Sequence, residues 1–168
     1  MTFRSLAAAA VLATAAMSAS AVTYNIGTLP LAPGVYSNTA VLPFSATPFT
    51  DRYDFVFPAL GATASASAVS VNVTGLFNIG NIQVSLFNSS NALVNAGSPG
   101  VSSSLFNVPL AAGASYYYTV TGTANGAVGG AYSFIASAAP VPEPETYALM
   151  LAGVGVIGFM AARRRPRG

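Results

Sequence analysis

Hydrophobic and polar residues alternate along the central part of the chain, residues 22–140. In four segments every second residue is apolar, and the apolar positions are rich in aromatic and β-branched side chains. Alternation with a period of two places one set of side chains on each face of a strand. We therefore predict half-buried antiparallel strands over these segments, which are 53–58, 69–74, 82–87 and 116–121.

Turn-forming residues punctuate this pattern. Glycine, asparagine, serine and proline interrupt the alternation at intervals of roughly 8–12 residues, a spacing typical of β-sandwiches. The region shows no helical periodicity, and roughly 120 residues are enough for two sheets around one core. We predict an all-β, antiparallel β-sandwich with turns at Gly61, Gly75, 88–91, 97–100, 112–113 and 129–130.

The first 21 residues have the organisation of a secretory signal peptide. Arg4 supplies the positive charge, residues 6–16 are apolar apart from one threonine, and Ala19 and Ala21 form an A-x-A cleavage pattern. Cleavage after Ala21 would leave Val22 as the first residue of the mature chain. We predict a signal helix here and export by the general secretion machinery.

A second hydrophobic segment lies near the C-terminus. Residues 147–162 are 16 residues without a charge, and as a helix they would extend about 24 Å, short of the roughly 30 Å hydrocarbon core. Spanning therefore requires that flanking side chains reach the interfaces or that the bilayer thins locally. We predict a transmembrane helix here. The arginines after it favour a cytoplasmic C-terminus and a body in the periplasm, and they are Arg163, Arg164, Arg165 and Arg167.

The C-terminal segment resembles a PEP-CTERM sorting signal. Pro142, Glu143 and Pro144 come first, a short apolar helix follows, and an arginine cluster ends the segment, in the order found in these signals. The resemblance covers residues 141–167. It implies processing near the Pro-Glu-Pro triplet by exosortase, a membrane-embedded enzyme of Gram-negative bacteria, so that the inner membrane would hold the protein only transiently. A permanent single-pass anchor is the alternative.

The composition excludes several kinds of chemistry. Only 6% of the 168 residues are charged, and the chain has no Cys, His, Trp or Lys. It therefore has no thiolate or imidazole nucleophile, base or zinc ligand. The net charge is +2, but four of the six basic residues lie in the last six positions, so the charge is not the footprint of a nucleic-acid-binding surface. We expect no cofactor and no nucleic-acid partner.

One strand of the body carries a family motif. The run Phe49-x-Asp51-x-Tyr53-x-Phe55 resembles the motif of the FxDxF type of PEP-CTERM proteins. Tyr53 stands where that motif has its second phenylalanine.

The body as a whole resembles the bacterial pre-peptidase C-terminal (PPC) domain. The matching parts are an Asp-x-Tyr-x-Phe strand at 51–55, the segments 82–88 and 110–120, and a closing Gly-x-Tyr-x-Phe strand at 130–134. The resemblance extends over about residues 51–136. It implies a jelly-roll-like β-sandwich and a non-catalytic accessory module.

Asp51 and Asp54 are the carboxylates of the body and its candidate metal ligands. A calcium ion takes oxygen ligands, which these residues and loop carbonyls would supply. However, residues three apart in a strand point to opposite faces, which separates the two carboxylates. We therefore expect no catalytic carboxylate pair and no enzyme activity. In the structural interpretation Asp51 caps the turn before its strand, and Arg52 pairs with one of the two aspartates.

Three consecutive tyrosines form a candidate sugar-binding platform. In a strand, Tyr116 and Tyr118 share one face and Tyr117 lies on the other. We expect ordinary packing of these rings, and the alternative is that an exposed Tyr117, together with Phe87, contacts a ligand.

These observations favour an exported, non-catalytic protein of the cell surface or extracellular matrix. The sorting-signal resemblance implies a role with exopolysaccharide in biofilms. A charge-poor surface of hydroxyl, amide and aromatic groups suits a neutral polysaccharide or self-association. The alternatives are a carbohydrate- or Ca²⁺-binding accessory module and a permanently anchored envelope protein.

Overall fold

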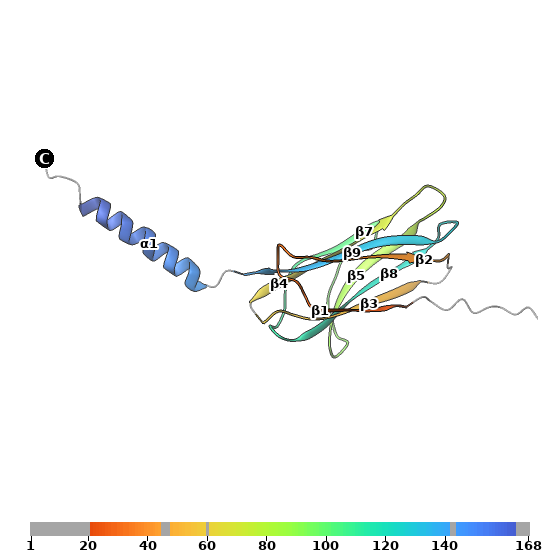
Figure 1. Cartoon of the computed structure of the whole chain (residues 1–168), viewed down its shortest axis with the longest axis horizontal. Helices are drawn as coiled ribbons and strands as arrows, with labels where there is room; N and C mark the ends of the chain where they lie inside the picture. The colour runs from red at the N-terminus through yellow and green to blue at the C-terminus, as the bar shows by residue number, and fades with distance from the viewer. Residues whose placement is uncertain (1–20, 45–47, 60, 142–143, 164–168) are drawn as a thin grey trace, which may run out of the picture.

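The computed structural model describes residues 21–44, 48–59, 61–141 and 144–163. Within these ranges the chain forms two stacked β-sheets followed by one helix (Figure 1). The predicted signal helix over residues 1–20 lies outside the described residues. The strands are β1 (Thr23–Thr28), β2 (Tyr36–Leu42), β3 (Phe49–Val56), β4 (Ala62–Val71), β5 (Ile79–Asn88), β6 (Leu93–Ala96), β7 (Ser102–Pro109), β8 (Ser115–Ala124) and β9 (Gly130–Pro140).

The strands divide into a five-stranded and a four-stranded sheet. The five-stranded sheet has the order β1-β3-β8-β5-β6, and the four-stranded sheet has the order β2-β9-β4-β7. Neighbouring strands are antiparallel, except that β1 and β3 are parallel. This exception follows from topology, because the chain crosses to the other sheet as β2 before it returns as β3. The prediction of an all-β sandwich is confirmed.

The inner faces of the two sheets form one core. Ile82, Val84 and Leu86 of β5 are fully buried, as their alternation predicts. Aromatic rings fill the middle of the sandwich, where Tyr53 of β3 stacks on Phe134 of β9 with ring centroids 4.2 Å apart. Such rings bury large apolar areas and dominate core energetics.

The segment 69–74 does not follow the predicted pattern. Strand β4 ends at Val71, and its inward residues are four alanines, at positions 62, 64, 66 and 68. Side chains alternate between the two faces of a strand, and the alanines occupy the even positions that face the core. Val69 and Val71 are at odd positions and therefore point to the outer face, where they are 48% and 41% exposed. The four-stranded sheet thus presents apolar side chains to solvent.

Helix α1 (Pro144–Arg163) follows the sandwich and lies apart from it in Figure 1. It begins three residues before and ends one residue after the predicted segment 147–162. Among the residues that the structure describes, no helix is both long enough and apolar enough to cross a membrane. The helix prediction is therefore confirmed, whereas the predicted membrane span is not found.

Candidate functional site

The two aspartates of β3 lie on opposite sides of the five-stranded sheet, as their spacing predicts. Asp51 is fully buried between the sheets. Its Oδ2 accepts a hydrogen bond from the Tyr132 hydroxyl at 2.5 Å, and its Oδ1 accepts one from the Val22 backbone N–H at 3.0 Å. The expectation that Asp51 caps a turn is wrong, because the residue lies within the strand and its partners come from distant segments.

A chain of buried hydroxyl groups extends from Asp51 across the core. The Tyr53 and Tyr132 hydroxyl oxygens are 2.8 Å apart, and Asn38 donates to the Tyr53 oxygen at 3.3 Å. Burial raises the pKa of both tyrosines, and for Tyr132 the hydrogen bond to Asp51 raises it further. Both phenols therefore stay neutral donors. The network joins β3 of one sheet to β2 and β9 of the other.

The FxDxF-type motif is the inner face of β3. Phe49, Asp51, Tyr53 and Phe55 are all buried. The departure from the motif at Tyr53 adds a hydroxyl group, and that group is satisfied by the network. The side chains of the motif therefore stabilise the core of the sandwich.

On the outer face of the same sheet, Tyr117 is covered. The Arg52 guanidinium carbon lies 3.6 Å from the centroid of the Tyr117 ring, and an Arg52 Nη2 forms a 2.7 Å ion pair with Asp54. Phe87 stacks beside the ring with centroids 5.2 Å apart, and the Tyr117 hydroxyl donates to Asn91 Oδ1 at 2.9 Å. Tyr117 is only 7% exposed, so the expected ordinary packing of this ring is confirmed and the alternative, an open platform with Phe87, is wrong. The planar guanidinium occupies the place of a ligand.

The candidate metal ligands Asp51 and Asp54 do not converge. One faces the core and the other faces solvent. In the described part of the chain, no group of three or more His, Cys, Asp or Glu side chains is placed to hold a metal ion.

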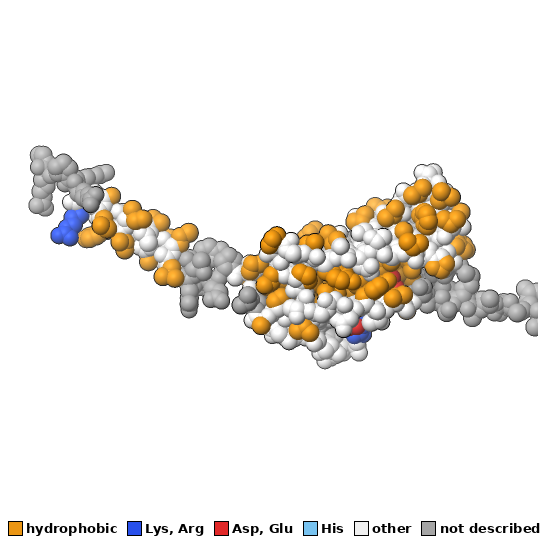
Figure 2. Space-filling model, viewed as in Figure 1, with side chains coloured by type: hydrophobic (Ala, Val, Ile, Leu, Met, Phe, Trp, Pro, Cys, Tyr) orange, Lys and Arg blue, Asp and Glu red, His pale blue; other side chains and the backbone are white. Residues whose placement is uncertain are grey.

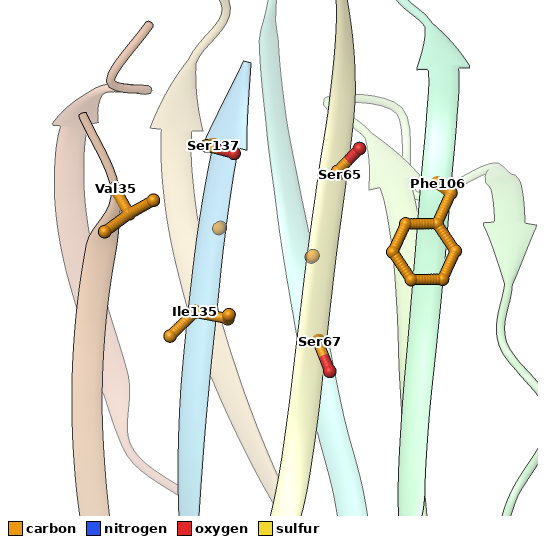
Figure 3. Close-up of a pocket in the computed structure, with 8 residues that line it drawn as sticks. Val35, Ser65, Ser67, Phe106, Ile135 and Ser137 are labelled. Carbon is orange, nitrogen blue, oxygen red and sulfur yellow. The ribbon is translucent and has the colours of Figure 1, made fainter. Parts of the chain in front are cut away.

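The outer face of the four-stranded sheet contains a shallow groove of about 180 Å³ (Figure 3). Small side chains form its floor, Phe106 forms one wall, and Val35 and Ile135 form the other. The lining residues are Val35, Ser65, Ala66, Ser67, Phe106, Ile135, Ala136 and Ser137.

Strand register places the floor of this groove. On neighbouring strands β4 and β9, Ser65 lies opposite Ser137, and Ser67 lies opposite Ile135. Cross-strand partners on one face of a sheet are adjacent, so three hydroxyl groups gather between the two walls. These side chains are partly buried and leave the groove open.

A β-bulge in β7 places the aromatic wall. Pairing between β4 and β7 shifts its register here, and Leu105 and Val108 both point inward. Phe106 and Asn107 therefore both point outward, and Phe106 is 72% exposed. Asn107 adopts the left-handed region, with φ of 52°, and its N–H donates to Ser65 Oγ at 3.1 Å. Bulges commonly redirect a side chain in this way.

The groove lacks any group for acid–base chemistry. Its lining consists of apolar and serine side chains, none of which titrates near neutral pH. It offers an apolar ring surface beside hydroxyl donors and acceptors. Sequence reasoning missed this site because the alternation breaks at Phe106 and Asn107, and the break was the available signal.

The predicted processing residues are only partly described. Ala21 is exposed before β1, whereas Ala19 lies outside the described residues. Pro144 is the first residue of α1, a position that suits proline, and Arg163 is the last. The remaining residues of the Pro-Glu-Pro triplet and of the arginine cluster lie outside the described residues, and they are Pro142, Glu143, Arg164, Arg165 and Arg167.

Two solved structures are similar to this chain at low identity. The pre-peptidase C-terminal domain of a collagenase from Bacillus anthracis is 20% identical, with a TM-score of 0.43; the match covers 71% of this chain and 96% of that domain. PliG, a periplasmic inhibitor of g-type lysozyme from Aeromonas hydrophila, is 13% identical, with a TM-score of 0.35; the match covers 71% of this chain and 99% of that protein. No protein with a curated description matches the chain.

A protein family matches the C-terminal segment. Residues 140–165 agree with the family described as the PEP-CTERM protein-sorting motif. This match includes the Pro-Glu-Pro triplet, α1 and the first arginines after it. The C-terminal segment of this chain is therefore a PEP-CTERM protein-sorting motif, and it indicates an exported protein that is sorted by exosortase.

Proposed function

We propose that the chain is a non-catalytic protein of the cell surface or extracellular matrix whose body binds neutral exopolysaccharide. The observation that carries the proposal is the sorting motif at residues 140–165. In this proposal the signal peptide is removed after Ala21. The inner membrane is a transient partner, contacted through α1, and exosortase then cuts the chain near 142–144.

The position of the last strand supports cleavage at that place. Strand β9 ends at Pro140, and Val141 after it is 51% exposed. A cut near 142–144 removes α1 and leaves all the described strands in the product. Processing thus separates the body from its anchor without loss of core residues.

Intact mass measurement of the protein from its native host tests this route. We expect a product that starts at Val22 and ends between residues 142 and 145, with any added mass located at that new C-terminus. A product that retains residues 163–168 would contradict sorting by cleavage and would favour a permanent anchor.

The groove on the four-stranded sheet supports binding of a neutral polysaccharide. A sugar ring has apolar C–H faces and a rim of hydroxyl groups. Phe106 offers a flat apolar surface for such a face, and the floor serines offer donors and acceptors for the rim. Because the lining carries no charge, it provides no attraction for an anionic polymer.

A substitution at the aromatic wall tests this part of the proposal. Phe106→Ala is expected to weaken binding to a neutral glucan, or to purified host exopolysaccharide, about tenfold, because the apolar contact with the ring is lost. Phe106→Tyr should retain binding. Phe44→Ala removes another exposed aromatic ring outside the groove and serves as the control. Equal binding by the Phe106→Ala and Phe44→Ala variants would contradict the assignment of the groove.

A further inference from the structure

Among the residues that the structure describes, the buried carboxylate of Asp51 has no cationic partner. Its two neutral donors are the Tyr132 hydroxyl and the Val22 backbone N–H. Arg52 is the one basic residue between positions 22 and 140, and it lies on the opposite face in an ion pair with Asp54. A carboxylate that is fully buried without a countercharge is destabilising unless it is well compensated.

Val22 is the residue at which the predicted leader ends. It is held firmly beside β3, because the Arg52 N–H donates to the Val22 carbonyl oxygen at 2.8 Å while the Val22 N–H donates to Asp51. Its side chain is 41% exposed, and Ala21 before it is exposed. The bond between Ala21 and Val22 therefore lies at the surface, with the nitrogen of that bond 3.0 Å from a buried carboxylate oxygen.

We propose that Asp51 is the binding site for the α-ammonium group of the mature chain. The inference rests on the proposed export and on cleavage after Ala21. Hydrolysis breaks the Ala21–Val22 amide bond, and water supplies hydroxide to the Ala21 carbonyl carbon. The Val22 nitrogen takes the remaining proton of that water and the proton released as the new Ala21 carboxyl group ionises. It becomes an ammonium group, and the leader leaves with a C-terminal carboxylate. The same hydrogen bond then becomes an ion pair, because the nitrogen gains a positive charge where it already contacts Asp51.

This arrangement couples removal of the leader to the stability of the sandwich. In the precursor a neutral amide donates to the Asp51 carboxylate. In the mature chain both groups carry a charge, so a Coulomb attraction is added to the hydrogen bond. The ammonium also matches the charge count of the mature body, in which Arg52 pairs with Asp54 and the N-terminus pairs with Asp51.

A stability comparison tests the site. The chain from Val22 to Gly168, in detergent, is prepared with a free N-terminus and with an acetylated one, each with Asp51 and with Asp51→Asn. We expect acetylation to raise the unfolding equilibrium constant about tenfold with Asp51 and to have little effect with Asp51→Asn. Asp54→Asn is the matched control, because it neutralises the exposed carboxylate of the same strand, and acetylation should keep its tenfold effect there.

The outcomes separate this inference from the proposed route. N-terminal sequencing of the exported protein decides whether cleavage yields Val22. If the chain starts at Val22 but acetylation has no effect with Asp51 present, the binding site is refuted while the export route stands. If the exported chain starts at another residue, the proposal is refuted even where acetylation has an effect. If Asp51→Asn does not fold, the comparison of the free and acetylated chains with Asp51 and with Asp54→Asn still decides the outcome.

Discussion

The two sheets of the sandwich share a core but differ on their outer faces. The five-stranded sheet carries the charged residues of the body, all of them in β3, and Arg52 covers its outward Tyr117 ring. The four-stranded sheet has no charged residue, and its outer face presents serines, valines and the exposed ring of Phe106. In Figure 2, hydrophobic and uncharged polar side chains cover most of the visible body, with only small areas of charge.

The difference shows that aromatic content alone does not mark a binding surface. Tyr117 has an aromatic neighbour, Phe87, with which a sugar platform would form, yet a guanidinium lies over the Tyr117 ring. Phe106 has no aromatic neighbour within its groove, yet its face is free. What distinguishes them is the neighbouring cation, which packs on one ring and is absent beside the other.

The largest expected effect concerns the core that both sheets share. Burial raises the pKa of Tyr53, Tyr118 and Tyr132 above the ordinary value of about 10. Above pH 10 these phenols ionise in the unfolded state but stay protonated in the fold, so the unfolded state binds fewer protons and stability falls as pH rises. Relative to about pH 8, we expect the free energy of unfolding at about pH 11 to fall by about 4 kcal/mol, with roughly equal shares from the three tyrosines.

Urea denaturation at a series of pH values measures this effect. A triple variant with Phe at these three positions is the comparison, and it should lose much less stability between pH 8 and pH 11, with a remaining share from Tyr36, whose pKa burial also raises, and from the N-terminal ammonium group. An equally steep loss in that variant would show that other groups cause the alkaline transition.

A smaller effect distinguishes two buried hydroxyl groups. Tyr132→Phe removes the hydroxyl donor to the buried Asp51 carboxylate, and we expect the free energy of unfolding to fall by about 3 kcal/mol. Tyr118→Phe is the matched control, since the Tyr118 hydroxyl is buried and has no hydrogen-bond partner in the described part of the chain. Its removal should be neutral or slightly stabilising. Denaturation of the two variants side by side measures the contrast, and equal losses would contradict the network.

The smallest effect tests the comparison between the outer faces. Arg52→Ala removes an ion pair that is partly exposed and uncovers the Tyr117 ring, and we expect stability to fall by about 1 kcal/mol. In a Phe106→Ala background, the uncovered ring should restore part of the binding to a neutral glucan. Arg52→Lys is the control, because it retains the positive charge but not the planar group. Failure to restore binding would show that an exposed ring is not sufficient.

Local patterns predicted the parts of the fold that depend on neighbouring residues. The alternation at 53–58, 82–87 and 116–121 placed the right side chains in the core, because strand geometry is local. For the segment 69–74 the alternation assigned the valines to the core, and this was wrong. The four preceding alanines face the core instead, and their burial depends on the opposite sheet, which a local pattern does not contain. The sorting motif was recognised for the same reason as the strands, since its elements are contiguous.

The candidate site depends on contacts that sequence spacing does not contain. The partners of Asp51 are 29 and 81 residues away, so no local rule places them beside it. The covering of Tyr117 depends on pairing between β3 and β8. The exposure of Phe106 depends on a one-residue bulge in β7. In the sequence this bulge is visible only as an interruption of the alternation between apolar and polar residues.

The position of β9 has a mechanical consequence. This last strand lies inside its sheet, with β2 on one side and β4 on the other. In a chain that is attached to the cell surface by its processed C-terminus, tension would enter the sandwich through β9. The strand would then have to slide past two neighbours at once, breaking both ladders of hydrogen bonds together. A sandwich tethered in this way resists pulling at its attachment point better than one tethered through an edge strand.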